Sequence, residues 1–340
     1  MSQTLSRFAG QIDQDWLDRH TEPVLDPDLP IVDPHHHLWM RDGNVYLMAD
    51  LLADIATGHN VVATVFEECH SMYRQSGPED ERALGETEFV AGVAAMAASG
   101  AFGPSRLCAR IVGRVDLTLG FRAGPLLERH MIAGGGRFAG IRQSSAWDAA
   151  IHKVVPRPGL LLDSEFRAGF ACLAALGLVF DAWVYHPQLH EVTDLAAAFP
   201  ATQIVLNHVG SPILGGPYAG DRGKVFQDWK AGMTALARYP NVTVKLGALP
   251  IRLPGGAPID KTLPPSSEET AAAWRPWLET SIDLFGAERC MFESNFPVQK
   301  RWSSYQVTWN AFKRIAAGAS AAEKAALFAG TAARVYGVPL

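Results

Sequence analysis

Three consecutive histidines, His35, His36 and His37, follow a short β-branched run within the segment IVDPHHHLW at residues 31–39. If the chain stays extended here, side chains alternate between two faces, so His35 and His37 project to one side and His36 to the other. Two imidazoles about 6–7 Å apart on one side of a strand end can bind one metal ion or one polar substrate. His-x-His pairs also occur as ordinary surface residues, so the pair alone leaves both interpretations open.

Two further histidines follow apolar runs in the same way. His186 comes directly after LVFDAWVY, and His208 comes directly after QIVLN. A lone buried histidine is usually a core residue with satisfied hydrogen bonds, but four at equivalent strand ends would be an improbable coincidence. We therefore expect His35, His37, His186 and His208 to share one site.

The elements that must position these histidines are predicted from the hydrophobic pattern. Apolar runs without alternation are typical of strands buried on both faces of a parallel sheet, and they recur with helical stretches between them. The predicted strands begin at residue 31 and continue at 61–66, 107–112, 138–142, 178–185, 203–207, 242–246 and 290–293. The main predicted helices span 49–57, 87–98, 125–131, 165–176, 189–199, 225–239, 274–285, 305–317 and 321–336.

Eight strands alternating with helices favour a (β/α)8 TIM barrel over an open doubly wound sheet. No G-x-G-x-x-G follows the first strand and no G-x-x-x-x-G-K-S/T is present, which weakens nucleotide binding as an alternative. Residues 1–30 are polar and then rich in proline, so we expect an N-terminal arm followed by a single barrel domain at 31–340.

Composition limits the class of partner. The chain has 340 residues, 48% hydrophobic and 19% charged, which indicates a globular protein with a sizeable core. A net charge of -5 without a basic stripe argues against nucleic acid. Four cysteines without CxxC spacing predict reduced thiols, and the longest apolar run, 168–180, is too short to span a bilayer. We expect a cytoplasmic protein that acts on a small molecule, without a membrane partner, and on general grounds a homo-oligomer.

Charged residues at other strand ends are candidates for binding and proton transfer, because catalytic groups of barrels come from the carboxyl ends of different strands. Arg142 and Lys245 are the cations that could bind an anionic substrate or a developing oxyanion. Glu67 and Glu293 are the candidate general bases, and either Glu67 or Glu68 must face inward. The alternative for each carboxylate is a buried ion pair with Arg142 or Lys245.

The segment 247–267, GALPIRLPGGAPIDKTLPPSS, is too long for a simple connection. Because it follows the seventh predicted strand, we expect it to cover the substrate, with a surface excursion as the alternative. Specificity is expected to depend on this segment and on the loops at 73–81 and 144–162.

Four motifs together resemble the amidohydrolase superfamily over residues 28–340: D-x-H-x-H-L-W, Tyr-His-Pro, Asn-His-x-Gly-x-Pro and Met-Phe-x-Ser-x-Phe-Pro. Within it, the sequence is most similar to the amidohydrolase-related branch that includes sugar-acid lactonases and 2-pyrone-4,6-dicarboxylate lactonase. The resemblance implies that His35 and His37 are the ligand pair of the first strand, that His186 and His208 are the histidines of strands five and six, and that an aspartate on strand eight is catalytic.

Asn295 stands where the resemblance implies that aspartate. An asparagine side chain has no basic group at neutral pH, and the loss of one carboxylate should lower metal affinity. Three alternatives remain. The histidines bind a divalent ion, zinc being the first candidate, that acidifies its water unaided. Catalysis runs without metal, with the histidines and Arg142 polarising a carbonyl. The barrel only binds a ligand.

The function expected from these features is hydrolysis of a small cyclic ester, either a lactone of a sugar acid or a product of aromatic degradation. Water would attack the lactone carbonyl, the four histidines would bind the metal or the carbonyl oxygen, and Arg142 would orient a carboxylate or hydroxyl. The alternatives are a metal-dependent decarboxylase or hydratase of the same superfamily and a non-catalytic binding barrel.

Overall fold

A central parallel sheet closes into a barrel in the computed structural model, which describes residues 12–41, 43–151, 154–249 and 262–340. The strand order is β1-β4-β5-β6-β7-β8-β9-β10. The bounds are β1 Ile31–His36, β4 Val61–Glu67, β5 Arg106–Gly113, β6 Phe138–Arg142, β7 Val179–Ala182, β8 Ile204–Leu206, β9 Val242–Leu246 and β10 Cys290–Phe292. The barrel closes between β1 and the residues that follow β10. There His36 pairs with Phe296, and the Asn295 N–H donates to the His35 carbonyl oxygen at 2.9 Å. The predicted (β/α)8 barrel is confirmed.

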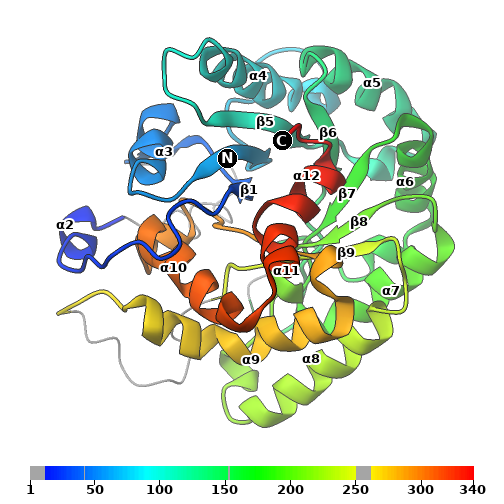
Figure 1. The fold of residues 1–340 in the computed structure, drawn as a ribbon. Helices are drawn as coiled ribbons and strands as arrows, with labels where there is room; N and C mark the ends of the chain where they lie inside the picture. The colour runs from blue at the N-terminus through cyan, green and yellow to red at the C-terminus, as the bar shows by residue number, and fades with distance from the viewer. Residues whose placement is uncertain (1–11, 42, 152–153, 250–261) are drawn as a thin grey trace.

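Helices cover the outside of the barrel (Figure 1). They are α3 Met48–Ile55, α4 Leu84–Ala98, α5 Ala123–Ala133, α6 Ser164–Leu176, α7 Leu189–Ala198, α8 Arg222–Leu236, α9 Ser267–Phe285 and α10 Tyr305–Ile315. Polar side chains cap the N-termini of several of these helices. The Asp163 carboxylate accepts from the Phe166 N–H at the start of α6, and the Ser266 hydroxyl accepts from the Glu269 N–H at the start of α9.

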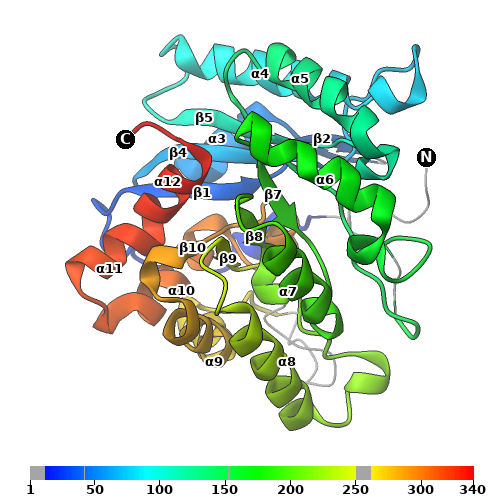
Figure 2. The same ribbon diagram turned by 90° about the vertical axis from the view of Figure 1, so that its right-hand side faces the viewer.

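The end of the barrel from which the strands start is closed by the C-terminal segment (Figure 2). Helix α11, Ala321–Ala325, continues through a π-helical turn at Ala326–Gly330 into α12, Thr331–Tyr336, where the sequence predicted one regular helix. Small side chains of this segment pack against the inward-facing residues of the strands, among them Val32, Ala63 and Val205. The opposite end, where the strands finish, is the end at which barrels carry active sites.

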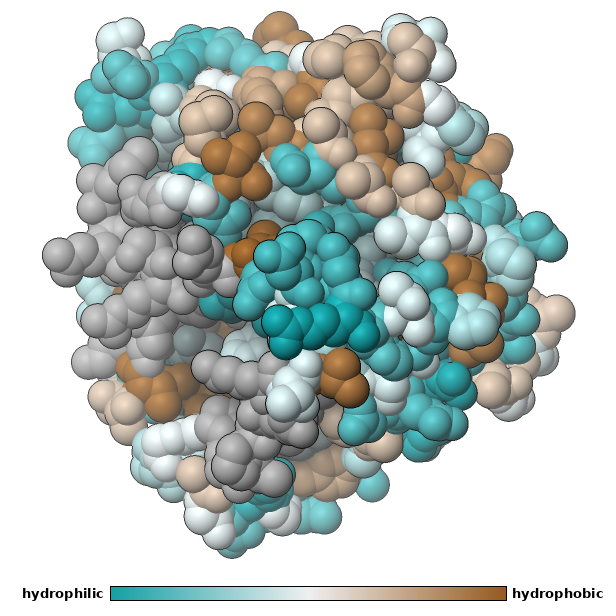
Figure 3. Space-filling view, turned by 90° about the vertical axis from the view of Figure 1, so that its left-hand side faces the viewer, coloured by the Kyte–Doolittle hydropathy of each residue, from teal (hydrophilic) through white to brown (hydrophobic). Residues whose placement is uncertain are grey.

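The described part of the N-terminal arm lies against α10. The Asn310 side chain accepts from the Leu25 N–H and donates to Glu22, and Lys313 Nζ donates to the Leu25 carbonyl. The short helix α2, Gln14–Leu17, belongs to this arm, and the side of the molecule that carries it presents hydrophilic side chains at its centre (Figure 3). Within the described ranges, no helix is long and apolar enough to cross a membrane.

Two local predictions need correction. The fifth strand was expected to span 178–185, but β7 ends at Ala182, so the apolar residues that follow it form a loop. A two-stranded hairpin, β2 Trp39–Arg41 and β3 Asn44–Tyr46, follows β1 and was not predicted. Most of the expected substrate-covering segment 247–267 lies outside the described residues.

Candidate active site

Three imidazoles gather where the strands finish. The ring centroids of His35 and His37, at the end of β1, are 5.0 Å apart, and the centroid of His208, beyond the end of β8, is 4.7 Å from that of His35. His36 points elsewhere, because its Nε2 lies 2.8 Å from Thr64 Oγ1. The structure therefore brings His35, His37 and His208 together, as the alternation along the first strand and the position after the sixth predicted.

Glu293 lies between two of these histidines. Its Oε2 is 2.7 Å from His35 Nδ1, its Oε1 is 2.7 Å from His208 Nδ1, and its side chain is fully buried. Glu293 Oε1 accepts from His208 Nδ1, so that ring carries its proton on Nδ1. Glu293 Oε2 lies close to His35 Nδ1 but has no hydrogen-bond partner among the described residues, and the hydrogen-bond contact of His35 Nδ1 is with Lys245 Nζ, at 3.3 Å.

The third imidazole also has an acceptor at Nδ1. His37 Nδ1 lies 2.8 Å from the Glu67 carbonyl oxygen, which only accepts, so this histidine is protonated on Nδ1. His37 and His208 consequently present an unprotonated Nε2, whereas both ring nitrogens of His35 face cations, Lys245 Nζ and Arg142 Nη1, each at 3.3 Å. Burial lowers the pKa values of His35 and His37 well below 6.5, helped by the charges of Lys245 and Arg142 respectively, so both rings are neutral near pH 7.

Arg142, the last residue of β6, is anchored beside these histidines. Its Nε donates to Glu68 Oε1 at 2.9 Å, and its Nη2 donates to the Glu68 carbonyl. Its Nη1 points at His35 Nε2, 3.3 Å away. The charge of Arg142 outweighs the effect of burial and lowers the pKa of Glu68. The guanidinium is therefore fixed on two sides and has one donor nitrogen directed toward the histidines.

Lys245, on β9, lies deeper in the barrel. Its Nζ is 2.6 Å from Asp181 Oδ2, 2.8 Å from Glu67 Oε2 and 3.3 Å from His35 Nδ1. Burial would lower the pKa of Lys245, but the charges of Asp181 and Glu67 raise it, so the ammonium form persists. The Tyr336 hydroxyl of α12 donates to both oxygens of Asp181, at 3.0 and 2.8 Å. The residues that close the barrel thus connect with the site through buried ion pairs.

Negative charge exceeds positive charge in this network. Glu67, Glu68, Asp181 and Glu293 face two permanent cations, Arg142 and Lys245. Burial, and then the Asp181 charge, raise the pKa of Glu67 well above 4.5, and Glu67 Oε1 has no hydrogen-bond partner among the described residues. A divalent cation bound here would offset the excess of buried carboxylates.

Three side chains of this network could together hold a metal ion. Ligand atoms of His35, His208 and Glu293 all lie within 4.8 Å of one another. Glu293 Oε1 accepts from His208 Nδ1, and Glu293 Oε2 has no hydrogen-bond partner among the described residues, so Oε2 could bind an ion. His37 lies outside that compact group, beside His35.

The backbone bends sharply at two of the strand ends. His208, Val209 and Asn295 have φ values of 55°, 47° and 52°, in the left-handed region that non-glycine residues seldom adopt. Such conformations persist where the surrounding structure holds them, often at functional sites. An extended strand would place the side chains of Glu293 and Asn295 on one side, but the left-handed backbone at Asn295 breaks this alternation. The structure brings Glu293 to the histidines, and no hydrogen bond from the Asn295 side chain is found within the described ranges.

His186 lies in different surroundings. Because β7 ends at Ala182, His186 begins a 3-10 turn four residues later, and its Nδ1 accepts from the Ile213 N–H at 3.2 Å. Its ring packs edge-on against Tyr218, in a groove that Asp228 also lines. Among the described residues, no contact joins His186 to His35, His37 or His208, so the structure does not bring the fourth predicted histidine into the group.

Sequence reasoning missed Asp181 and Tyr336 as parts of this network. An aspartate in the middle of the apolar run LVFDAWVY was a signal that a cation must lie nearby, but nothing local identified Lys245.

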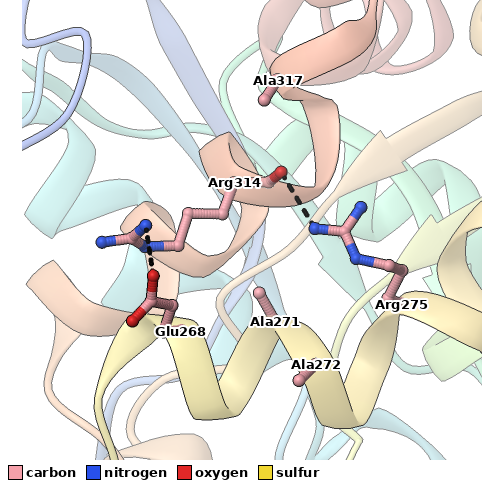
Figure 4. Close-up of a pocket in the computed structure, with 6 residues that line it drawn as sticks. All are labelled: Glu268, Ala271, Ala272, Arg275, Arg314 and Ala317. Atoms are coloured by element: carbon pink, nitrogen blue, oxygen red, sulfur yellow. Dashed lines mark hydrogen bonds and ion pairs between the residues drawn. The ribbon is translucent and has the colours of Figure 1, made fainter.

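A separate surface groove between α9 and α10 is lined by Arg275, Arg314 and Glu268 (Figure 4). Its arginines are engaged within the protein, since Arg275 donates to the Arg314 carbonyl and Arg314 donates to Ser267, so we assign it no role.

The chain is similar to known proteins over most of its length. The family model described as Amidohydrolase matches residues 32–338. An uncharacterized protein, y4mH of Sinorhizobium fredii, is 34% identical over 337 residues, which cover 92% of this chain and 99% of the relative. An L-fucono-1,5-lactonase of Burkholderia multivorans is 32% identical over 244 residues, covering 68% of this chain and 72% of that enzyme.

A solved structure shows the same architecture. The crystal structure of an amidohydrolase from Burkholderia multivorans with bound zinc superposes with a TM-score of 0.70 and 26% sequence identity. The match covers 91% of this chain and 99% of that one.

Proposed function

This chain belongs to the amidohydrolase family and is a hydrolase, and we propose that it opens a lactone of a sugar acid. The observation that carries the proposal is the gathering of His35, His37 and His208 where the strands finish, with Glu293 and Arg142 beside His35. Such a group suits the activation of water for attack on an ester carbonyl. The choice of a sugar-acid lactone is supported by the 32% identity to an L-fucono-1,5-lactonase.

We propose zinc as the cofactor, held by His35, His37 and His208 with the Glu293 carboxylate beside them. Three neutral imidazoles are a common ligand set for catalytic zinc, and the excess of buried carboxylates offsets the charge of a dication. The zinc bound by a relative of 26% identity supports this choice. When bound, the ion would lower the pKa of a coordinated water to about 7.

Arg142 and Glu67 are the remaining charged residues to which we assign roles in the reaction. Arg142 Nη1 is the donor of the guanidinium that faces the histidines, so it would donate to the lactone carbonyl oxygen, where negative charge develops during attack. Glu67 Oε1 and Glu293 Oε2 both lack a hydrogen-bond partner among the described residues, so both carboxyls are candidates for the general base. We assign the role to Glu67, because burial raises the pKa of this carboxyl well above 4.5.

The substrate is a small molecule, and we propose the cytoplasm as the location. All four cysteines are free and three of them are buried, which suits a reducing compartment.

A panel of sugar-acid lactones tests the function. The zinc-loaded protein should release acid from at least one 1,5- or 1,4-lactone, followed at constant pH by base consumption. His208→Ala should reduce the rate to background, because it removes one of the three imidazoles. Background rates with every sugar-acid lactone would contradict the proposal, and so would an undiminished rate for His208→Ala.

A further inference from the structure

Trp183 is the first residue after β7, between the strand ends that carry Arg142 and His208. In the sheet, β7 pairs with β6 on one side and with β8 on the other. The guanidinium carbon of Arg142 lies over the indole ring, 5.6 Å from its centroid, and the centroid of the His208 ring lies 6.1 Å away, with the two rings edge-on. One aromatic side chain therefore lies against both the proposed oxyanion donor and one of the proposed zinc ligands.

The indole ring is held in one position. Its Nε1–H, which can only donate, points to Ser211 Oγ at 3.2 Å, and the main-chain carbonyl of Trp183 accepts from the Ser145 N–H at 3.0 Å. The ring nevertheless keeps part of its surface exposed, whereas its neighbours Ala182 and Val184 are buried. A fixed, partly exposed aromatic face at the end of the barrel where the histidines gather is suited to contact a ligand.

The ring of a sugar-acid lactone is complementary to such a face. The face of an indole ring carries partial negative charge, and the C–H groups on one face of a sugar ring, polarised by neighbouring oxygens, carry partial positive charge. Stacking buries these C–H groups and leaves the hydroxyl groups, which project from the ring edge, free to hydrogen-bond elsewhere in the site. The carbonyl group at the edge of the same lactone ring would then lie beside Arg142.

The charges of the site disfavour a ligand with a further carboxylate. Arg142 and Lys245 are each paired with buried carboxylates, which outnumber these two cations in the network. A bound dication would only balance this excess, so an additional anionic group on the ligand would find neither cation of the network available to it. A neutral ring with hydroxyl groups has no such cost.

We propose that Trp183 determines the substrate specificity of the site: it stacks against the C–H face of a neutral lactone ring that carries hydroxyl groups, and so selects lactones of sugar acids over flat aromatic acids. This inference rests on the proposed function, because it positions the ring of the proposed substrate. Trp183 acts on binding and takes no part in proton transfer.

Trp183→Leu tests the role through the balance of KM and kcat. Loss of a contact made equally with the bound substrate and with the transition state raises KM and leaves kcat unchanged. Trp183→Leu should raise KM for the best sugar-acid lactone of the panel by about tenfold or more, with kcat within about threefold of wild type. Trp183→Phe keeps an aromatic face and should give a smaller rise. Trp16→Leu, at a partly exposed tryptophan of α2 in the N-terminal arm, is the matched control and should leave KM unchanged.

Binding is measured without turnover by isothermal titration calorimetry with two probes. The first is the 1,5-lactam of the sugar acid whose lactone is hydrolysed fastest, or glucono-1,5-lactam if none is hydrolysed, and the second is isophthalate, a flat aromatic diacid. The lactam should bind the wild type more tightly than isophthalate does. Trp183→Leu should weaken lactam binding by about tenfold or more, with unchanged zinc content and far-ultraviolet circular dichroism. This loss would support the inference even if no lactone were hydrolysed, which separates it from the proposed function.

Four results would overturn the inference. The first is a KM and a lactam affinity that Trp183→Leu leaves at their wild-type values, and the second is a wild type that does not bind the lactam. The third is a fall in kcat with unchanged KM, which would leave Trp183 only the role of holding Arg142. The fourth is isophthalate binding that is tighter than lactam binding and is lost in Trp183→Leu, which would assign the indole face to aromatic ligands.

Discussion

Lys245 Nζ lies 2.6 Å from Asp181 Oδ2 in the middle of the barrel, and neither side chain has any exposed surface. Removing the lysine would leave Asp181 and Glu67 as buried carboxylates without their cation. Breaking a buried ion pair on one side typically costs about 3–5 kcal/mol, so Lys245→Met should lower the free energy of unfolding by about that amount in urea denaturation. Lys224→Met, which removes an exposed lysine paired with Asp228, should leave it nearly unchanged. Equal effects of the two substitutions would contradict the buried network.

A second prediction concerns stability and pH at Glu86, whose carboxylate accepts from the Cys69 and Ser71 N–H groups. Burial raises the pKa of Glu86 from 4.5 to about 8. A carboxyl whose pKa is raised on folding contributes stability that is complete below the unfolded pKa and is lost as the pH rises through the folded one. The free energy of unfolding should therefore fall between pH 4.5 and about 8 in the wild type, relative to Glu86→Gln.

The measurement is urea denaturation of both proteins across this pH range. Glu79→Gln, at an exposed position, is the matched control and should follow the wild-type curve. A constant difference in stability between wild type and Glu86→Gln at all pH values would disprove the raised pKa.

Arg142 is predicted to lower the affinity for zinc and to raise the rate of lactone hydrolysis. Its Nη1 lies 3.3 Å from His35 Nε2, so Arg142→Gln removes a positive charge next to a proposed zinc ligand. Zinc affinity should rise by about tenfold or more, while kcat/KM for the lactone should fall by about 10²–10³, as for other oxyanion donors. Arg142→Lys keeps the charge and should keep the zinc affinity close to wild type. Weaker zinc binding in Arg142→Gln would contradict the assignment.

Glu67 is predicted to be the general base. Glu67→Gln keeps the shape of the side chain and the main-chain carbonyl to which His37 donates, so zinc content should be retained. The value of kcat should fall by about 10²–10⁴, because proton acceptance is lost. The measurement is lactone hydrolysis by zinc-saturated protein, compared with Glu293→Gln. If Glu293→Gln lost the larger part of kcat and Glu67→Gln did not, the general base would be Glu293.

The fold could be predicted because buried parallel strands leave a strong pattern. The apolar runs at 138–142 and 242–246 coincide with β6 and β9. The run LVFDAWVY led to a predicted strand that is too long, because hydrophobicity alone cannot distinguish the strand from the buried loop that follows Ala182. That error placed His186 at a strand end. The family resemblance read from the motifs is confirmed by the family model over residues 32–338.

The site was only partly predictable. Alternation along an extended strand put His35 and His37 on one side, and the position after an apolar run indicated His208. Alternation failed at Asn295, where the left-handed backbone re-aims the side chains. The Tyr336 bond to Asp181 joins residues 155 positions apart, and no local pattern in either segment points to the other.

The most direct test of the account is the metal content of the purified protein, paired with lactone hydrolysis before and after chelation. We predict about one zinc ion per chain, loss of hydrolysis on chelation and recovery on adding zinc. His208→Ala should lose the ion, and His186→Ala, whose ring lies in a separate groove, should keep it. Full lactone hydrolysis by protein without metal would contradict the account, as would zinc that is lost from His186→Ala but retained by His208→Ala.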